Sequence, residues 1–263
     1  MLNKLEKAIC ILSSIAIRKE ASDVSEMVSQ ALFGDLMHIV KRQNNWCFIE
    51  LEFDSYEGWI DGRAFAQLTE TEYNNLKTTK PFIIDKPYCK ATVLNNQSFV
   101  YLSLGSSIYN LDGNVFKVAG NTYIFEQIPE TNEKLTQRQL VISVAYNFLN
   151  TPYLWGGRTI MGIDCSGLVQ LAFKVASISM KRDAFQQAEQ GSIIEFIGEA
   201  IPGDILFFEN TEGRIIHTGI LLAQNKIIHA SGCVRIDSID HEGIYNHEKK
   251  AYTHKLKLIK RVI

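Results

Sequence analysis

The stretch GIDCSGLVQLAFK, residues 162–174, decides the fold of the second half of this chain. Asp164 is a residue type that caps helix N-termini, and apolar residues follow it at helical spacing as far as Val175. The pattern predicts a helix that begins near Cys165 and carries this cysteine in its first turn. Free backbone N–H groups and the positive end of the helix dipole meet there, so the site favours a thiolate and can hold an oxyanion.

Strands and one further helix surround this segment in the sequence. Upstream, Thr136 and Gln139 form a capping box, and Asn150-Thr151-Pro152 ends the helix that they begin. Downstream, four strand-like segments follow: GDILFFE, IIHTGILLA, KIIHAS and KLKLIKRVI. Helices followed by a run of strands predict an α+β domain with helices packed on an antiparallel sheet.

The first half of the chain has a different pattern. Short alternating segments between residues 9 and 68 predict a small β-barrel. A polar stretch at 69–81 separates them from a second β-rich region, which extends to about residue 128. We therefore expect three domains, at residues 1–75, 76–130 and 131–263.

Composition excludes several classes of function. The chain has 263 residues, is 46% hydrophobic and carries a formal charge of −2, which gives no support for nucleic-acid or membrane binding. Its five cysteines are odd in number and form no C-x-x-C pair, so neither a disulfide framework nor a structural zinc site is expected. No metal or cofactor is predicted, and no Walker or G-x-G-x-x-G motif is present.

The N-terminal region imitates an export signal. The apolar run at 8–17 follows two lysines, but Arg18, Lys19 and Glu20 stand where small cleavage-site residues belong. Alternation within the run indicates a strand, and no stretch is long enough to span a membrane. Cytoplasmic localisation is the expectation; a periplasmic or extracellular one stays open if an export signal has been removed.

Two histidines in HTGILLAQNKIIHASG, residues 217–232, are candidates for a catalytic base and its partner. The segment reads as a β-hairpin in which His217 and His229 lie 12 positions apart, an even spacing. An odd-length turn centred on Ala223 or Gln224 puts both imidazoles on one face of the sheet, whereas a two-residue turn puts them on opposite faces. A nucleophilic thiol needs such a base and a group that orients it.

The other histidines give a weaker pattern. His241, His247 and His254 are spaced too loosely for a convincing metal site. A polar loop before the final strand explains them better.

Three motifs, in order and spacing, resemble the NlpC family of papain-like cell-wall cysteine peptidases over roughly residues 135–263. They are DCSGLV at 164–169, HTGI beginning 52 residues after Cys165, and the IIHASG segment, whose histidine lies 12 residues further on. By this resemblance Cys165 is the nucleophile, His217 the base and His229 the polar third residue. The upstream YLWGG implies that Tyr153 lines the oxyanion site and that Trp155 walls the groove.

The front of the chain resembles the bacterial SH3-like domain that precedes the peptidase in one subgroup, through SEMVSQALFGD at 25–35 and YEGWID at 56–61. The second β-rich region, at 76–130, is expected to be a further small SH3-like domain. That subgroup cuts the γ-D-glutamyl to L-diamino acid bond of murein peptides with a free N-terminal L-Ala, where the diamino acid is diaminopimelate or lysine. The resemblance implies a substrate site built from Trp155, Asp164, Ser166, Asp183, Tyr56 and Glu26. Asp183 is the first choice for the free amine. Ala184 departs from the serine common at that position.

Two other functions fit parts of the sequence. The same thiol constellation can transfer an acyl group to an acceptor other than water. The β-rich front half can make the chain a wall-binding or anchoring protein. The leading expectation is a monomeric enzyme whose partner is the peptide L-Ala-γ-D-Glu-diamino acid and whose role is in recycling wall peptides.

Overall fold

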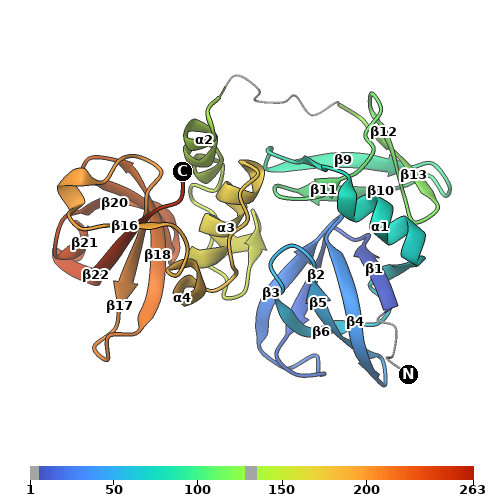
Figure 1. Cartoon of the computed structure of the whole chain (residues 1–263), viewed down its shortest axis with the longest axis horizontal. Helices are drawn as coiled ribbons and strands as arrows, with labels where there is room; N and C mark the ends of the chain where they lie inside the picture. Colours follow the sequence, from blue (N-terminus) through green and yellow to red (C-terminus); the bar gives the residue numbers. More distant parts are fainter. Residues whose placement is uncertain (1–5, 128–134) are drawn as a thin grey trace. The chain divides into compact units, whose positions relative to one another are not determined.

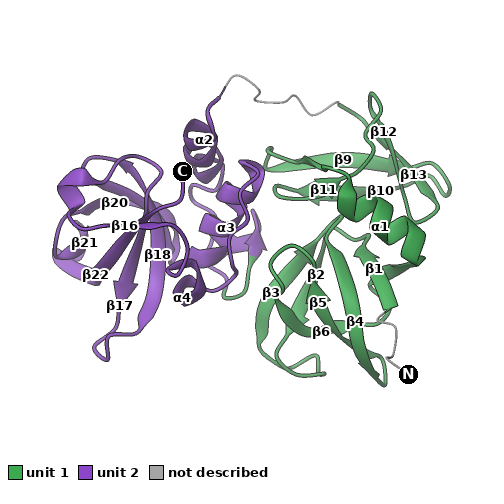
Figure 2. Ribbon diagram, viewed as in Figure 1, with its two compact units in different colours: residues 1–131, 155–157 green, residues 132–154, 158–263 purple. Residues whose placement is uncertain are grey.

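The computed structural model describes residues 6–127 and 135–263 (Figure 1). The chain forms two compact units (Figure 2). Unit 1 comprises Met1–Thr131 and Trp155–Gly157, and unit 2 comprises Asn132–Leu154 and Arg158–Ile263. The predicted domain boundary at 130 and 131 lies outside the described residues, and the division into three domains stays a prediction.

Unit 1 begins with a seven-stranded antiparallel sheet in the order β3-β2-β6-β5-β4-β1-β7. Burial alternates along β2 and β5, as the sequence pattern predicts for strands with one face in a core. The strands are β1 (Glu6–Cys10), β2 (Ser14–Arg18), β3 (Met27–Leu32), β4 (Leu36–Gln43), β5 (Trp46–Leu51), β6 (Glu57–Asp61) and β7 (Phe65–Leu68).

The polar stretch at 69–81 is not a plain linker, because it contains the helix α1 (Glu70–Thr78). Thr69 and Glu72 form a capping box, and Tyr73 and Leu76 are buried. The boundary predicted between the first two domains, at residues 75 and 76, therefore falls inside this helix. Capping and two buried side chains are enough to form it, although most of its residues are polar.

The second β-rich region shares a hydrophobic core with the first sheet. Phe33, directly after β3, packs its ring against Phe116 and Tyr123, with centroids 6.0 and 5.4 Å away. This region holds a four-stranded sheet, β10-β9-β13-β12, and the pair β11-β8. The strands are β8 (Phe82–Ile83), β9 (Tyr88–Val93), β10 (Ser98–Ser103), β11 (Ser107–Ile108), β12 (Val115–Val118) and β13 (Asn121–Phe125).

Unit 2 combines helices with an antiparallel sheet in the order β16-β22-β17-β18-β19-β20-β21, as predicted for an α+β domain. A further pairing of β21 with β22 closes this sheet on itself. The sheet strands are β16 (Ser192–Ile194), β17 (Ile205–Glu209), β18 (Ile215–Ala223), β19 (Lys226–Ser231), β20 (Cys233–Ile239), β21 (Gly243–Asn246) and β22 (Ala251–Arg261). The small pair β14 (Arg158–Thr159) and β15 (Gly162–Ile163) precedes them.

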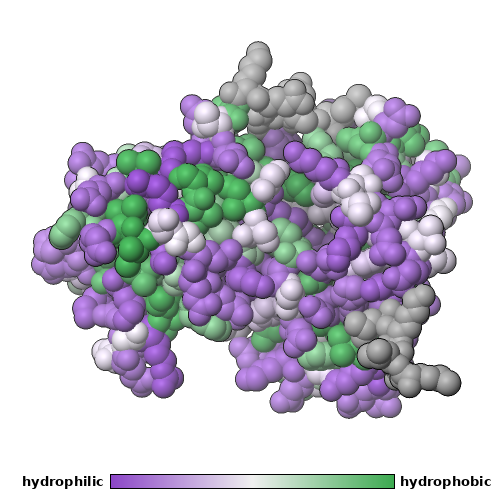
Figure 3. All heavy atoms as spheres, viewed as in Figure 1, coloured by the Kyte–Doolittle hydropathy of each residue, from purple (hydrophilic) through white to green (hydrophobic). Residues whose placement is uncertain are grey.

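The helices of unit 2 are α2 (Gln137–Asn147), α3 (Cys165–Val175) and the short α4 (Ala184–Gln187), with a 3-10 turn at Ile197–Glu199. The predicted capping box of Thr136 and Gln139 begins α2. Every residue of α3 is buried, so this helix is the central element of the unit. In the view of Figure 3, apolar side chains gather over part of unit 2. Within residues 6–127 and 135–263, no helix is long and apolar enough to cross a membrane.

Candidate active site

The helix α3 begins at the predicted nucleophile, Cys165. Asp164 has extended backbone angles, and its Oδ1 accepts a hydrogen bond of 2.7 Å from the backbone N–H of Gly167. This is the predicted N-cap, and it holds Cys165 in the first turn of the helix. The cysteine is 6% exposed.

The surroundings of Cys165 favour the thiol over the thiolate at rest. Burial and the neighbouring carboxylate of Asp164 raise the pKa of the Cys165 thiol to about 12. Hydrogen bonds from the backbone of Thr218 and Ser166 and the charge of Arg182 act in the opposite direction. The expected thiolate at the helix N-terminus is therefore not the resting form, because burial outweighs the favourable N–H groups, and a base must take the proton during attack.

The two predicted histidines lie on one face of the sheet, but by a different route from the one expected. The turn between β18 and β19 has two residues, since Ala223 pairs with Lys226. The register then shifts between Leu221 and Ala223, so that a β-bulge returns the two imidazoles to the same face. Nε2 of His217 lies 2.9 Å from Nδ1 of His229, and both rings are buried.

Gly219 leaves room for His229, the residue that pairs with it across the two strands. A Cβ at position 219 would lie 2.8 Å from the carbonyl oxygen of Ile228 and 2.9 Å from Cβ of His229. A side chain at position 219 would therefore displace His229.

Asp237, on β20, continues the polar chain and was not predicted from the sequence. Its Oδ2 lies 3.0 Å from Nε2 of His229, and Arg235 donates to its other oxygen at 3.1 Å. The signal was present: Ser-Gly at 231–232 predicts a tight turn, and in the resulting hairpin Arg235 lies opposite His229. Asp237, two residues further on, then shares a face with His229.

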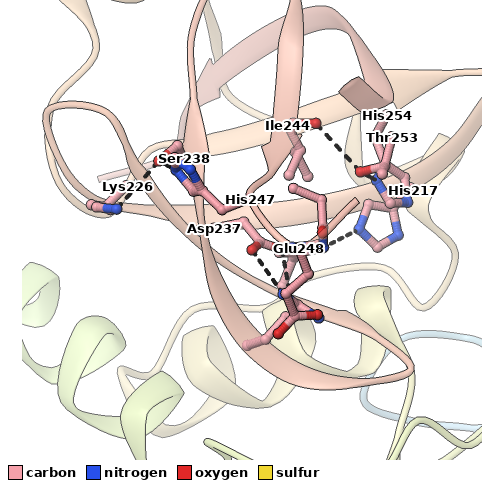
Figure 4. A network of polar contacts seen from close by, with 12 residues as sticks. His217, Lys226, Asp237, Ser238, Ile244, His247, Glu248, Thr253 and His254 are labelled. Atoms are coloured by element: carbon pink, nitrogen blue, oxygen red, sulfur yellow. Dashed lines mark hydrogen bonds and ion pairs between the residues drawn. The ribbon is translucent and has the colours of Figure 1, made fainter. Parts of the chain in front are cut away.

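His254 also reaches the site, contrary to the prediction that a polar loop holds it. It lies on β22, and its ring stacks on His217 with centroids 4.2 Å apart and an interplanar angle of 26° (Figure 4). Burial and the neighbouring His229 lower the pKa of His254 to about 4. Burial, His229 and His254 lower the pKa of His217 well below its usual value. His217 and His254 are therefore neutral at pH 7.

Among the residues that the structure describes, His217, His229 and His254 form the group that could share a metal ion. One nitrogen of each ring lies within 4.8 Å of the other two. The fit to a resident metal is poor. Tetrahedral zinc with Zn–N distances of about 2.0–2.1 Å needs ligand nitrogens roughly 3.3 Å apart. Nε2 of His217 and Nδ1 of His229 are 2.9 Å apart, the distance of a hydrogen bond between them.

A buried ion pair between Arg182 and Asp164 stabilises the start of α3. Arg182 is 1% exposed and donates to both oxygens of Asp164, at 3.0 and 2.5 Å. It also donates to Oγ of Ser166 at 2.8 Å. Asp164 and Ser166, both predicted to contact substrate, thus bind Arg182 on either side of Cys165.

Comparison with known proteins gives the family. The profile of the NlpC/P60 family matches residues 150–253, and that of the bacterial dipeptidyl-peptidase Sh3 domain matches residues 17–65. The probable endopeptidase NlpC of Escherichia coli (strain K12) is 36% identical over 109 residues, which are 39% of this chain and 70% of that protein. The chain belongs to the NlpC/P60 family. The predicted resemblance, the papain-like fold and the SH3-like front end are confirmed.

Two further similarities extend over most of this NlpC/P60 chain. The γ-D-glutamyl-L-lysine dipeptidyl-peptidase of Bacillus subtilis (strain 168) is 28% identical over 218 residues, covering 77% of this chain and 71% of that protein. A crystal structure of an NlpC/P60 family protein from Bacillus cereus ATCC 10987 has a TM-score of 0.79 at 17% identity, and covers 97% of this chain and 99% of that one. The chain is a cysteine peptidase of the NlpC/P60 family, as predicted.

Tyr153, which the NlpC/P60 resemblance assigns to the oxyanion site, is held by backbone contacts. Its N–H donates to the carbonyl of Gly232 at 2.9 Å, and the residue pairs with Ile163. Burial and the nearby groups of Cys165 and Asp164 raise the pKa of the Tyr153 phenol. The hydroxyl therefore keeps its proton and can donate a hydrogen bond.

Asp183 caps α4 in unit 2. It forms a capping box with Gln186, whose Oε1 accepts from the Asp183 N–H at 3.2 Å. Ala184, where the resemblance led us to expect a serine, is the first residue of that helix. The role of Asp183 toward an amine stays a prediction.

Glu26, Tyr56 and Trp155, the other predicted substrate residues, belong to unit 1. Trp155 Nε1 donates to Oε1 of Glu26 at 2.7 Å, and Lys19 lies 3.7 Å from the second oxygen. Gly156 supports this arrangement with φ of +75°, and a Cβ there would lie 2.5 Å from the carbonyl oxygen of Met27. Tyr56 packs against the core of the first sheet.

Proposed function

We propose that this enzyme hydrolyses the bond between γ-D-glutamate and the L-diamino acid of murein peptides that carry a free N-terminal L-Ala. The similarity to a protein named γ-D-glutamyl-L-lysine dipeptidyl-peptidase, over more than two thirds of both chains, supports this substrate. The hydrogen-bonded pair His217 and His229 beside the helix that bears Cys165 is the observation that supports the reaction.

The proposed reaction begins with a neutral thiol and a neutral imidazole. His217 takes the proton of Cys165 as the sulfur attacks the γ-carbonyl carbon. The backbone N–H of Cys165 at the start of α3 and the hydroxyl of Tyr153 stabilise the oxyanion. The imidazolium then gives its proton to the leaving amine of the diamino acid, and water activated by His217 hydrolyses the thioester.

The proposed selectivity for a free amine has an electrostatic basis. Asp183 supplies a carboxylate for an ammonium group, and Ser166 is a candidate partner of the D-Glu α-carboxylate. An acylated N-terminus removes the charge and adds bulk, and is rejected on both grounds.

A pair of synthetic peptides tests this function. The wild-type enzyme should release the diamino acid from L-Ala-γ-D-Glu-diaminopimelate or its lysine analogue, and Cys165→Ala should release none. Acetylation of the L-Ala amine should lower kcat/KM by at least tenfold. Equal cleavage of free and acetylated peptides would contradict the free-amine requirement. Products formed on added amines faster than hydrolysis products would identify an acyltransferase.

We further propose that the enzyme acts as a cytoplasmic monomer on peptides already released from the wall. Cell fractionation and analytical ultracentrifugation test these two points. Sedimentation with purified sacculi should leave the protein in the supernatant, whereas pelleting would indicate a wall-binding function.

A further inference from the structure

The carboxylate of Asp237 follows His217 and His229 in a chain of hydrogen bonds and determines which ring nitrogens carry protons. His229 and Asp237 are 1% and 5% exposed, with Nε2 and Oδ2 3.0 Å apart. Burial raises the pKa of Asp237, but hydrogen bonds from His229 and Arg235 lower it overall. Asp237 is therefore ionised and can only accept hydrogen bonds.

An acceptor at this position dictates the hydrogens of both imidazoles. Nε2 of His229 must carry the proton that Asp237 accepts, so Nδ1 of His229 presents a lone pair. Nε2 of His217, 2.9 Å away, must then donate to it. The remaining nitrogen of His217, Nδ1, is left without a proton.

We infer that Asp237 is a positioning residue, which fixes the tautomers of His229 and His217 and leaves Nδ1 of His217 as the base for Cys165. The inference rests on the proposed function for its catalytic meaning, although the tautomers can be measured without substrate. Arg235 holds the carboxylate in place, with Nη2 donating to Oδ1 at 3.1 Å and Nε lying 2.8 Å from Oδ2.

The substitution Asp237→Asn separates this role from simple packing, because asparagine has the same shape. Arg235 donates a hydrogen bond to Oδ1 through Nη2, whereas its Nε lies 2.8 Å from Oδ2 without the geometry of a hydrogen bond, so the amide oxygen takes the Oδ1 position and the NH2 group faces His229. His229 must then accept at Nε2 and donate from Nδ1, and His217 receives its proton on Nδ1. The base nitrogen is blocked, so asparagine should be at least as harmful as alanine.

Nitrogen-15 NMR of the histidine rings reads the tautomers directly. The measurement uses Cys165→Ala protein, in which no thiol proton can move to His217. With Asp237 present, both His217 and His229 should be protonated on Nε2. In the Cys165→Ala/Asp237→Asn protein, both should be protonated on Nδ1. A proton on Nδ1 of His217 while Asp237 is present would overturn the inference.

Kinetics give a second readout in the protein with its thiol. Asp237→Asn should lower kcat about 10²–10⁴-fold with KM nearly unchanged, by analogy with a triad acid changed to its amide. It should also slow alkylation of Cys165 by iodoacetamide, followed by peptide mass spectrometry because four other cysteines are free. Asp237→Glu, which restores an acceptor, should recover at least tenfold of the loss.

Asp204→Asn is a matched control, since Asp204 is also buried and held by an arginine, with Arg261 Nη2 2.6 Å from Oδ2. Asp204→Asn should leave kcat and the rate of Cys165 alkylation, each per folded molecule, within about twofold of wild type. If Asp237→Asn also lies within threefold of wild type in both assays, the inference is wrong. If alkylation and tautomers behave as expected but wild type cuts no murein peptide, the proposed function fails and the role of Asp237 stands.

Discussion

Removing the carboxylate of Asp164 should loosen the helix that carries Cys165. Asp164→Ala deletes an N-cap, which costs about 1 kcal/mol. It also leaves Arg182, 1% exposed, as a buried cation without its bidentate partner, which costs about 3–5 kcal/mol. The sum is about 4–6 kcal/mol. Asp164→Asn retains a capping side chain and should lose only the ion-pair part.

Hydrogen exchange suits this measurement better than tryptophan fluorescence. Trp46, Trp59 and Trp155 all belong to unit 1, so their emission does not report the stability of α3. Exchange of the amides at 165–175 measures the opening free energy of the helix. The tryptophan signal then serves as an internal control and should unfold at the wild-type denaturant concentration.

A second substitution tests the charge argument. Arg182→Met alone leaves a buried carboxylate and should also be destabilising. The double variant Asp164→Asn/Arg182→Met removes both charges of this pair and should be more stable than the sum of the single losses by at least about 2 kcal/mol. A loss below about 1 kcal/mol for Asp164→Ala, or strict additivity in the double variant, would refute the reasoning.

Three further predictions concern the histidine face of the sheet. His254 has a folded pKa of about 4 and titrates near 6.5 when unfolded, so the unfolded chain binds more protons in this window and unit 2 should lose stability as pH falls from about 6.5 to about 4. His254→Phe keeps a stacked ring on His217, and thermal melts from pH 4 to 7.5 should show a shallower loss; an unchanged pH dependence would contradict the assignment. Gly219→Ala places a Cβ against His229 and should lower kcat/KM at least tenfold, with Cys165 still in α3. Wild-type activity of this variant would contradict the prediction, because the strand would then have moved to accept the Cβ without disturbing His229. Dialysis against EDTA should leave peptide cleavage unchanged, because the histidine nitrogens closest to one another are occupied by a mutual hydrogen bond; lost activity that zinc restores would reveal a metal site.

Local signals in the sequence were sufficient for the elements that begin and end on strong markers. The cap at Asp164 and the capping box at Thr136 predicted the starts of α3 and α2, because both depend on neighbouring residues only. The same box, Thr69 with Glu72, begins α1, but the polar composition around it concealed the helix. Only Tyr73 and Leu76 are buried there, too few for a clear apolar period.

Residues that reach the site through sheet register were harder to predict. His254 comes near His217 because β18 and β22 both pair with β17, in a register that places Phe208 opposite His217 and Leu256, and no local pattern encodes this. A two-residue turn alone would place the two imidazoles on opposite faces of the sheet, and the bulge between Leu221 and Ala223 returns them to one face. No residue type in that segment predicts the bulge. Asp237 was accessible by hairpin register, once the turn at Gly232 was recognised.

The central claim is that Cys165 cleaves murein peptides after γ-D-glutamate when the N-terminal L-Ala amine is free. Mass spectrometry of a mixed muropeptide pool, incubated with wild type and with Cys165→Ala, tests it most directly. Wild type should produce L-Ala-D-Glu together with peptides that begin with the diamino acid, and only from components with a free L-Ala, while the variant produces neither. Release of the same products from peptides still joined to muramic acid, or by the Cys165→Ala protein, would contradict the account.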